Sequence, residues 1–204
     1  MGAYDNCIIL IPALQPDERL IQMIHGLHER GFLKIAVTDD GSSDDRQKYF
    51  QEVEIMGVKV IHHSKKMGKG VALRSALRLA DEKIGESDFY ITADCDGQYS
   101  PEDIEKVAKE LLENPDCFVL GVRTYERKKV RSRFVNSCQK LFFRITNHGK
   151  ECPDPRSGLR GFPASLKKLA LCTEGKSYDY ELNFLDAAIQ KSTDCSCTYL
   201  FRNT

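Results

Sequence analysis

Short apolar runs alternate with longer amphipathic segments over the first 122 residues. The runs are rich in β-branched residues and predict strands at residues 7–11, 34–38, 58–62, 89–93 and 117–122. Between them, apolar residues recur every three or four positions and predict helices starting at Asp17, Asp44, Gly70 and Pro101. This alternation is typical of an α/β domain with a mostly parallel central sheet and helices on both faces.

The start of the fourth helix carries a local signal of its own. Ser100 is a preferred N-cap residue, Pro101 suits the first helical position, and Asp103 stands where a capping-box acid belongs. This helix is therefore expected to begin at Pro101, directly after the polar stretch that follows the fourth strand.

The chain changes character after residue 122. Residues 123–150 carry nine Lys and Arg against one acid, Glu126, and their apolar residues are spaced as in a basic amphipathic helix. Residues 153–163 are expected to form a loop or a short strand, residues 178–190 a helix and residues 198–201 a last strand. Such clustered positive charge favours an anionic partner, although a solvated face would have the same composition.

Composition narrows the functional classes. The 204 residues hold 30 Lys and Arg and 30 Asp and Glu, so the net charge is zero, which argues against a nucleic-acid-coating protein. The sequence has neither an apolar run of the roughly 18 residues that span a bilayer nor a signal-peptide pattern. The 8 cysteines are scattered, without a Cys-x-x-Cys pair, and are expected to be reduced thiols.

Polar residues follow three of the predicted strands, and parallel sheets bind ligands at that edge. Asp94-Cys95-Asp96-Gly97-Gln98 offers two carboxylates that could hold Mg²⁺ or Mn²⁺, although a solvated acidic turn would have the same residues. A carboxylate of Asp39 or Asp40 could accept from a base or a ribose, whereas a simple strand-to-helix turn is the alternative. Lys69, between Gly68 and Gly70, could meet a phosphate or be a surface lysine.

In their order along the chain, these motifs resemble family 2 glycosyltransferases of the GT-A fold, over about residues 7–185. The matching stretches are Ile-Pro-Ala-Leu-Gln-Pro-Asp from Ile11, Asp-Asp-Gly-Ser from Asp39, Gly-Lys-Gly from Gly68, Ala-Asp-x-Asp-Gly-Gln from Ala93, Gly-x-Arg from Gly121 and Ser-Gly-Leu-Arg from Ser157. The Asp-x-Asp-Gly-Gln motif followed by Pro-Glu-Asp-Ile is similar to that of dolichyl- and polyprenyl-phosphate sugar synthases.

The resemblance implies roles for individual residues. On the donor side, the nucleotide sugar, a UDP- or GDP-sugar, would contact Pro12, Ala13, Leu14, Asp17, Asp39, Asp40, Lys69 and Cys95. Asp94, Asp96 and Gln98 would hold Mg²⁺ or Mn²⁺ and the diphosphate. Arg123, Arg133, Ser137 and Arg160 would face the acceptor phosphate, and Arg123 is counted with Asp94 and Asp96 as catalytic. The usual Asn-Glu after the first strand is Gln15-Pro16 here, so Asp17 is the candidate replacement for the missing carboxylate.

The expected reaction is metal-dependent, inverting transfer of a sugar to a polyprenyl phosphate at the cytoplasmic face of a membrane. A phosphate oxygen is already anionic, so it requires no strong general base. Two alternatives stay open: a hydroxyl acceptor, with Asp154, Asp179 or Glu181 as the base, and a non-catalytic nucleotide-sugar binding module.

The whole chain is expected to be one catalytic domain, with a nucleotide-sugar half at about residues 7–122 and an acceptor half at 123–204. Members of this branch often continue into membrane helices, some of the GtrA type, so the chain is expected to be truncated before such helices. The basic stretch is expected to give peripheral membrane contact. The sequence leaves the oligomeric state, a homo-oligomer included, open.

Overall fold

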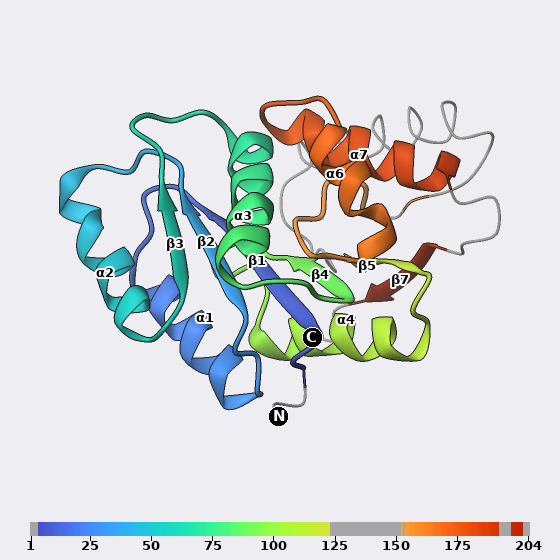
Figure 1. Ribbon diagram of the computed structural model, residues 1–204, viewed down its shortest axis with the longest axis horizontal. Helices are drawn as coiled ribbons and strands as arrows, with labels where there is room; N and C mark the ends of the chain where they lie inside the picture. The colour runs from blue at the N-terminus through green and yellow to red at the C-terminus, as the bar shows by residue number, and fades with distance from the viewer. Residues whose placement is uncertain (1–3, 123–151, 153, 192–196, 202–204) are drawn as a thin grey trace, which may run out of the picture.

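The computed structural model describes residues 4–122, 152, 154–191 and 197–201. Within these residues the chain forms one seven-stranded sheet with the order β3-β2-β1-β4-β6-β5-β7 (Figure 1). The strands are β1 (Cys7–Ala13), β2 (Ile35–Asp39), β3 (Lys59–His62), β4 (Phe89–Thr92), β5 (Phe118–Val122), β6 (Arg160–Pro163) and β7 (Cys197–Phe201). All neighbouring pairs are parallel except those of β6, which runs antiparallel between β4 and β5.

Helices cover both faces of the sheet, as the alternating pattern predicts (Figure 1). One hydrophobic cluster joins the sheet to α1 (Glu18–Glu29), α2 (Gln47–Ile55) and α4 (Pro101–Glu113). A second cluster joins the opposite face to α3 (Lys69–Lys83), α6 (Lys167–Cys172) and α7 (Tyr178–Lys191). Short 3₁₀ turns at Asp44–Arg46 and Ala164–Leu166 precede α2 and α6.

The central strand β1 explains why this sequence forms a sheet with two covered faces. Ile9 and Ile11 belong to the first hydrophobic cluster, and Ile8 and Leu10 belong to the second. Successive side chains of a strand point to opposite faces, so a continuous apolar run needs cover on both sides. The α/β class with a mostly parallel sheet, predicted from the sequence, is confirmed.

The strand β6 settles a choice that the sequence left between a loop and a strand. Its register pairs Tyr90 with Phe162 on one side and Leu120 with Arg160 on the other. The short helix α6, which follows it, is absent from the sequence-based expectation. The basic amphipathic helix expected within residues 123–150 falls outside the described residues.

In the described parts of the chain, no helix is both long and apolar enough to cross a membrane. The carboxyl ends of β1, β2 and β4 lie at one edge of the sheet, because these strands are parallel to each other. The loops that leave this edge carry the polar motifs, so the fold gathers them around one place.

Candidate functional site

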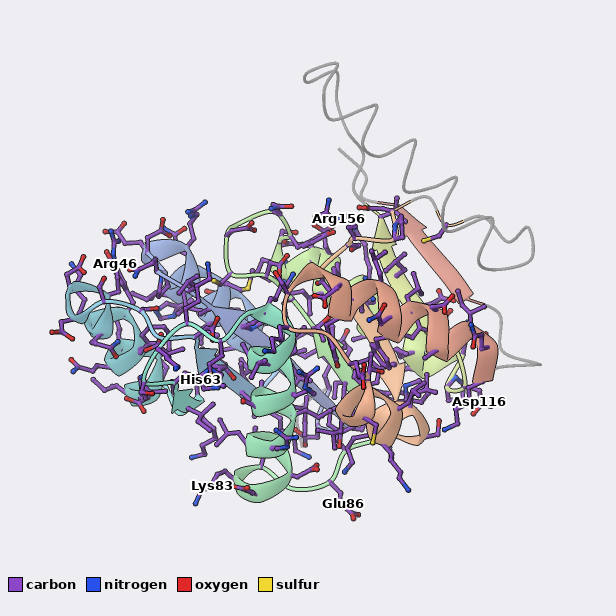
Figure 2. All side chains as sticks on the ribbon, turned by 90° about the horizontal axis from the view of Figure 1, so that it is seen from above. Arg46, His63, Lys83, Glu86, Asp116 and Arg156 are labelled. Atoms are coloured by element: carbon purple, nitrogen blue, oxygen red, sulfur yellow. The ribbon has the colours of Figure 1, made fainter. Side chains whose placement is uncertain are left out.

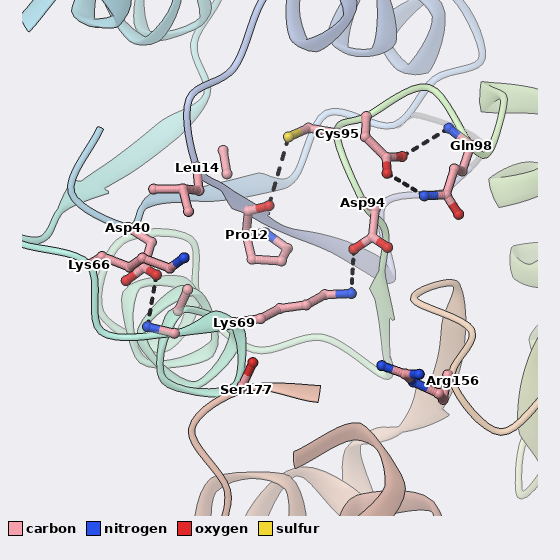
Figure 3. Close-up of a pocket in the computed structure, with 14 residues that line it drawn as sticks. Pro12, Leu14, Asp40, Lys66, Lys69, Asp94, Cys95, Gln98, Arg156 and Ser177 are labelled. Carbon is pink, nitrogen blue, oxygen red and sulfur yellow. Dashed lines mark hydrogen bonds and ion pairs between the residues drawn. The ribbon is translucent and has the colours of Figure 1, made fainter. Parts of the chain in front are cut away.

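A pocket of about 530 Å³ opens at this edge of the sheet (Figure 3). Its walls come from the ends of β1 and β4, the start of α3 and the loops before β6 and α7. The residues that line it are Pro12, Ala13, Leu14, Asp40, Lys66, Gly68, Lys69, Ala72, Asp94, Cys95, Asp96, Gln98, Arg156 and Ser177. Segments far apart in the sequence therefore meet around a mostly polar pocket.

The turn after β4 carries the two carboxylates of the Asp-x-Asp motif. Asp96 is exposed, and its carboxylate accepts a hydrogen bond from the Gln98 backbone N–H at 3.0 Å and another from the Gln98 side-chain amide (Figure 3). Gly97 has a φ of 81°, a left-handed conformation that glycine adopts without strain, and it lets the chain reverse between these two residues.

The oxygen atoms of this turn suit a hard divalent cation. No group of three His, Cys, Asp or Glu side chains in the described ranges is arranged to hold a metal ion by itself. Mg²⁺ sites that bind phosphate substrates commonly use one or two carboxylates and complete the shell with water and phosphate oxygens. Asp94, Asp96 and the amide oxygen of Gln98 offer that donor set, so these residues fit a cation that a diphosphate shares.

Lys69, the first residue of α3, lies between two carboxylates. Its ammonium is 2.6 Å from Asp94 Oδ1 and 2.7 Å from Glu181 Oε1. Burial alone would lower the pKa of Lys69, but the two carboxylates outweigh burial and raise the pKa above its usual value. Lys69 is therefore charged at neutral pH.

Two glycines let these groups approach closely. A Cβ on Gly158 would overlap the Asp94 carboxylate, and a Cβ on Gly70 would overlap the Tyr180 side chain. The backbone just before β6 therefore packs directly against the Asp-x-Asp turn, and α7 packs against the start of α3. The short spacing between these elements holds Glu181 of α7 within reach of Lys69.

Asp40 and Asp39 follow β2 and have different surroundings. The Asp40 carboxylate accepts from the backbone N–H groups of Met67 and Gly68, both at 2.8 Å, and contacts His63 Nδ1 at 2.9 Å. It thereby holds the loop between β3 and α3 at the rim of the pocket. These contacts take three of the roughly four acceptor positions of a carboxylate, which leaves one position for a ligand.

Asp39 does not line the pocket, although the sequence gives it the same expectation as Asp40. Its carboxylate accepts from Ser42 N at 2.8 Å and Gln47 Nε2 at 2.9 Å, and contacts His62 Nδ1 at 3.0 Å. Burial raises its pKa, but these hydrogen bonds outweigh burial and lower the pKa below its usual value. In the structure Asp39 fixes the turn after β2.

Asp17, expected to replace a missing carboxylate, is the N-cap of α1. It accepts from Arg19 N and forms an ion pair with the Arg19 guanidinium at 2.8 Å. The hydrogen bonds from Arg19 lower the pKa of Asp17 to about 2. Asp17 is absent from the pocket lining, so its contact with the nucleoside stays a prediction that this position does not favour.

Arg160 does not lie where a phosphate ligand is expected. Its residue is 2% exposed, and the guanidinium donates to the carbonyl oxygens of Ser157 at 2.8 Å, Pro155 at 2.8 Å and Glu181. These contacts tie the loop before β6 to α7. An acceptor-phosphate contact would require Arg160 to be accessible to a ligand. Instead, its side chain is buried, because β6 lies between β4 and β5 in the sheet.

Arg156, four residues earlier, lines the pocket instead. Arg156 stands directly before the Ser-Gly-Leu-Arg stretch, and the sequence patterns assign it no role. Sequence reasoning also missed four other lining residues, Lys66, Gly68, Ala72 and Ser177, of which Gly68 is named there only as part of the Gly-Lys-Gly stretch. Arg123, Arg133 and Ser137 fall outside the described residues.

Cys95 lines the pocket between the two aspartates, and its contact with the nucleotide sugar stays a prediction. Its thiol approaches the carbonyl oxygen of Pro12 at 3.9 Å. Burial first, and then the charges of Asp94 and Asp96, raise the pKa of Cys95 to about 12. The thiol therefore stays protonated and is a poor nucleophile.

Comparisons with known proteins identify glycosyltransferases as relatives of this chain. A UDP-N-acetylglucosamine--dolichyl-phosphate N-acetylglucosaminyltransferase of Methanococcus voltae is 28% identical over 190 residues, covering 84% of this chain and 75% of its own. Glycosyltransferase AglJ of Haloferax volcanii is 27% identical over 191 residues, covering 89% of this chain and 58% of its own.

Among solved structures, glucosyl-3-phosphoglycerate synthase from Mycobacterium tuberculosis with Mg²⁺ and UDP superposes with a TM-score of 0.74. The two chains are 18% identical, and the match covers 99% of this chain and 73% of the synthase. At that identity the likeness shows the fold alone. The model of glycosyl transferase family 2 matches residues 8–164, most of the chain. This protein therefore belongs to glycosyl transferase family 2.

Proposed function

We propose that this glycosyltransferase moves a sugar from a nucleotide diphosphate sugar to a polyprenyl phosphate at the cytoplasmic face of a membrane. The observation that carries the proposal is the pocket, where the Asp94–Gln98 turn faces Lys66, Lys69 and Arg156 (Figure 3). Oxygen ligands for a divalent cation and side chains that bind phosphate thus share one opening. The name of the Methanococcus voltae relative supports the same pairing of donor and lipid acceptor.

In this proposal the donor lies along the sheet edge. Pro12, Ala13 and Leu14 form one wall for the nucleoside, and Asp40 accepts from its base or ribose. The diphosphate lies near Lys69 and the Asp94–Gln98 turn. Mg²⁺ or Mn²⁺ held by Asp94, Asp96 and Gln98 would supply charge neutralisation for the departing diphosphate.

The acceptor side needs a cation rather than a base. A lipid-phosphate oxygen attacks the anomeric carbon in line, the new C–O bond forms as the bond to the diphosphate breaks, and the nucleoside diphosphate leaves with the bonding electrons. This displacement inverts the configuration. Arg156 can bind the acceptor phosphate through its forked guanidinium, and Arg123, Arg133 and Ser137 stay proposals for the same role.

The carboxylates that a hydroxyl acceptor would need are badly suited to general base catalysis. Glu181 is 1% exposed and paired with Lys69, and Asp154 is 6% exposed. The carboxylate of Asp179 accepts from the backbone of Ser177 at 2.7 Å, and these backbone hydrogen bonds lower its pKa. A general base works best with a pKa near the operating pH, so these surroundings support a phosphate acceptor.

The test is a transfer assay with the purified chain. UDP- and GDP-sugars labelled in the sugar are offered with Mn²⁺ and either a polyprenyl phosphate, the matching polyprenol or a soluble glycan. We expect label in the lipid-phosphate product alone, and loss of that product by a factor of 100 or more in Asp96→Ala, on the order of a removed charge-stabilising group.

The control is folding of Asp96→Ala, which is expected to be normal because Asp96 is exposed. Transfer to the polyprenol or the glycan, with none to the phosphate, would overturn the lipid-phosphate acceptor. Donor binding without any transfer would instead favour a nucleotide-sugar binding module.

A further inference from the structure

The ammonium of Lys69 forms an ion pair with Asp94 Oδ1, an oxygen atom that a bound metal ion would need as a ligand. Lys69 begins α3, Asp94 follows β4 and Glu181 lies in α7, so three separate elements supply one cluster. The side chains of Lys69 and Asp94 are 17% and 19% exposed, whereas that of Glu181 is 2% exposed. The cluster therefore has an open side at Asp94, toward the pocket (Figure 3), and a closed side at the buried Glu181.

A divalent cation that approaches Asp94 meets a positive charge already in place. The distance from Lys69 Nζ to Asp94 Oδ1 is 2.6 Å, the length of a strong charge-assisted contact. The Asp94 carboxylate cannot turn freely either, because Gly158 lies directly against it. The metal must therefore compete with the ammonium for the same carboxylate.

We propose that Lys69 excludes the divalent cation from Asp94 until a nucleotide diphosphate binds, so that the protein takes up the cation and the nucleotide together. The proposal rests on the proposed function and deepens it, because it assigns an order of events to the same pocket. Lys69 acts as a positioning residue and a charge substitute for the metal. Glu181 is a second positioning residue, which holds Lys69 on its closed side when Asp94 is released.

The negatively charged diphosphate changes the competition between Lys69 and the cation for Asp94. Its oxygens give the ammonium an alternative partner and also join the coordination shell of the cation. Coupling of two ligands is reciprocal, so the factor by which the nucleotide tightens cation binding equals the factor by which the cation tightens nucleotide binding. Without the nucleotide, Asp96 and Gln98 remain, and they hold the cation weakly.

The experiment measures Mn²⁺ binding by the loss of the free-ion paramagnetic resonance signal, with and without UDP. We expect weak binding of Mn²⁺ to the unmodified chain and a strong gain on adding UDP. In Lys69→Gln, Mn²⁺ alone is expected to bind about tenfold more tightly or better, because a unit charge a few ångströms away is removed. The gain from UDP is then expected to shrink. Lys65→Gln, at an exposed lysine of the same loop that does not line the pocket, is the control and keeps the unmodified behaviour.

Lys69→Gln leaves the buried Glu181 carboxylate without its ammonium, which can prevent folding. The double variant Lys69→Gln/Glu181→Gln removes both charges, and it is expected to show the same tighter binding of Mn²⁺ alone. An unchanged affinity for Mn²⁺ alone in the folded variant would overturn the proposal. Failure of the unmodified chain to bind Mn²⁺ even with UDP or GDP would instead contradict the proposed function.

Discussion

At the end of β3, two consecutive histidines reach two consecutive aspartates. The side chain of His62 is 42% exposed and contacts Asp39, away from the pocket lining. The side chain of His63 is 9% exposed and links Asp40 to Ser75 Oγ of α3, the latter at 2.9 Å. Figure 2 shows His63 between β3 and α3. Because a carboxylate oxygen accepts hydrogen bonds, the contact with Asp40 assigns the donor role to Nδ1 of His63.

His63→Ala is expected to weaken UDP or GDP binding about threefold to tenfold. Asp40 loses a hydrogen-bond donor, and its carboxylate is then held less firmly in the position where it binds the backbone N–H groups of Met67 and Gly68. Hydrogen bonds to charged groups contribute about 1.5–3 kcal/mol, and we expect part of this in the binding free energy. Titration calorimetry of the nucleotide measures the change.

The neighbouring His62→Ala is the matched control, since it removes an equivalent contact from Asp39 outside the pocket. We expect its nucleotide affinity to stay close to that of the unmodified chain. Equal losses in the two variants would argue that the effect comes from the strand end as a whole and not from Asp40.

Among the helices and strands, α4 is the one whose start depends most on residues that are neighbours in the sequence. The Ser100 side chain accepts from Asp103 N at 3.3 Å, the Asp103 carboxylate accepts from Ser100 N at 3.1 Å, and Pro101 starts the helix. The sequence predicted this capping box, and it is confirmed, because all of its parts lie within four residues. The cap also fixes where the chain leaves the Asp94–Gln98 turn.

Ser100→Ala is expected to lower the free energy of unfolding by about 1 kcal/mol, the usual loss for an N-cap side chain. Urea unfolding followed by circular dichroism measures it. Ser100→Thr keeps a hydroxyl at the cap and is expected to restore most of the stability. A destabilised Ser100→Thr, equal to Ser100→Ala, would contradict the assignment to capping.

At the scale of the whole molecule, Arg160 joins the loop before β6 to α7. It lies on β6 in the middle of the sheet, and its guanidinium reaches carbonyl oxygens of the loop before β6 and of α7. Buried carbonyl groups need a donor, and an unmatched one costs about 1–3 kcal/mol. Arg160 therefore stabilises the arrangement that brings α7 to the pocket.

Arg160→Met is expected to lower the free energy of unfolding by about 3 kcal/mol, since the buried carbonyl oxygens of Ser157 and Pro155 lose their donor and that of Glu181 loses its contact with the guanidinium. Thermal and urea unfolding measure the loss, with Arg156→Met as the partner variant. Arg156→Met is expected to keep its stability and to lose transfer to the lipid phosphate. The reverse pattern, with Arg160→Met stable and defective only in transfer, would restore the phosphate role first expected of Arg160.

The contrast between Arg156 and Arg160 shows what sequence patterns could and could not predict. Periodicity and caps gave the strands, the helices and the edge where the pocket opens, because these depend on neighbouring residues. The depth of a side chain depends on which strands pair, and the antiparallel insertion of β6 has no local signal. For the same reason Asp39 and Asp40, adjacent in sequence, could not be told apart, and the contact of Lys69 with Glu181 was not foreseen.

One feature of the sheet bears on how such enzymes can diversify. The chain leaves the sheet at Val122, the end of β5, and re-enters it at Arg160, the start of β6, and these two strands are paired neighbours. A segment whose two ends are anchored side by side can be lengthened or exchanged at little cost in loop entropy. Residues between Val122 and Arg160 therefore form a natural cassette for transplantation. Splicing a relative's segment at these two points, with Arg156 and Gly158 kept because they contact the pocket and the Asp94 turn, would test whether acceptor choice resides there.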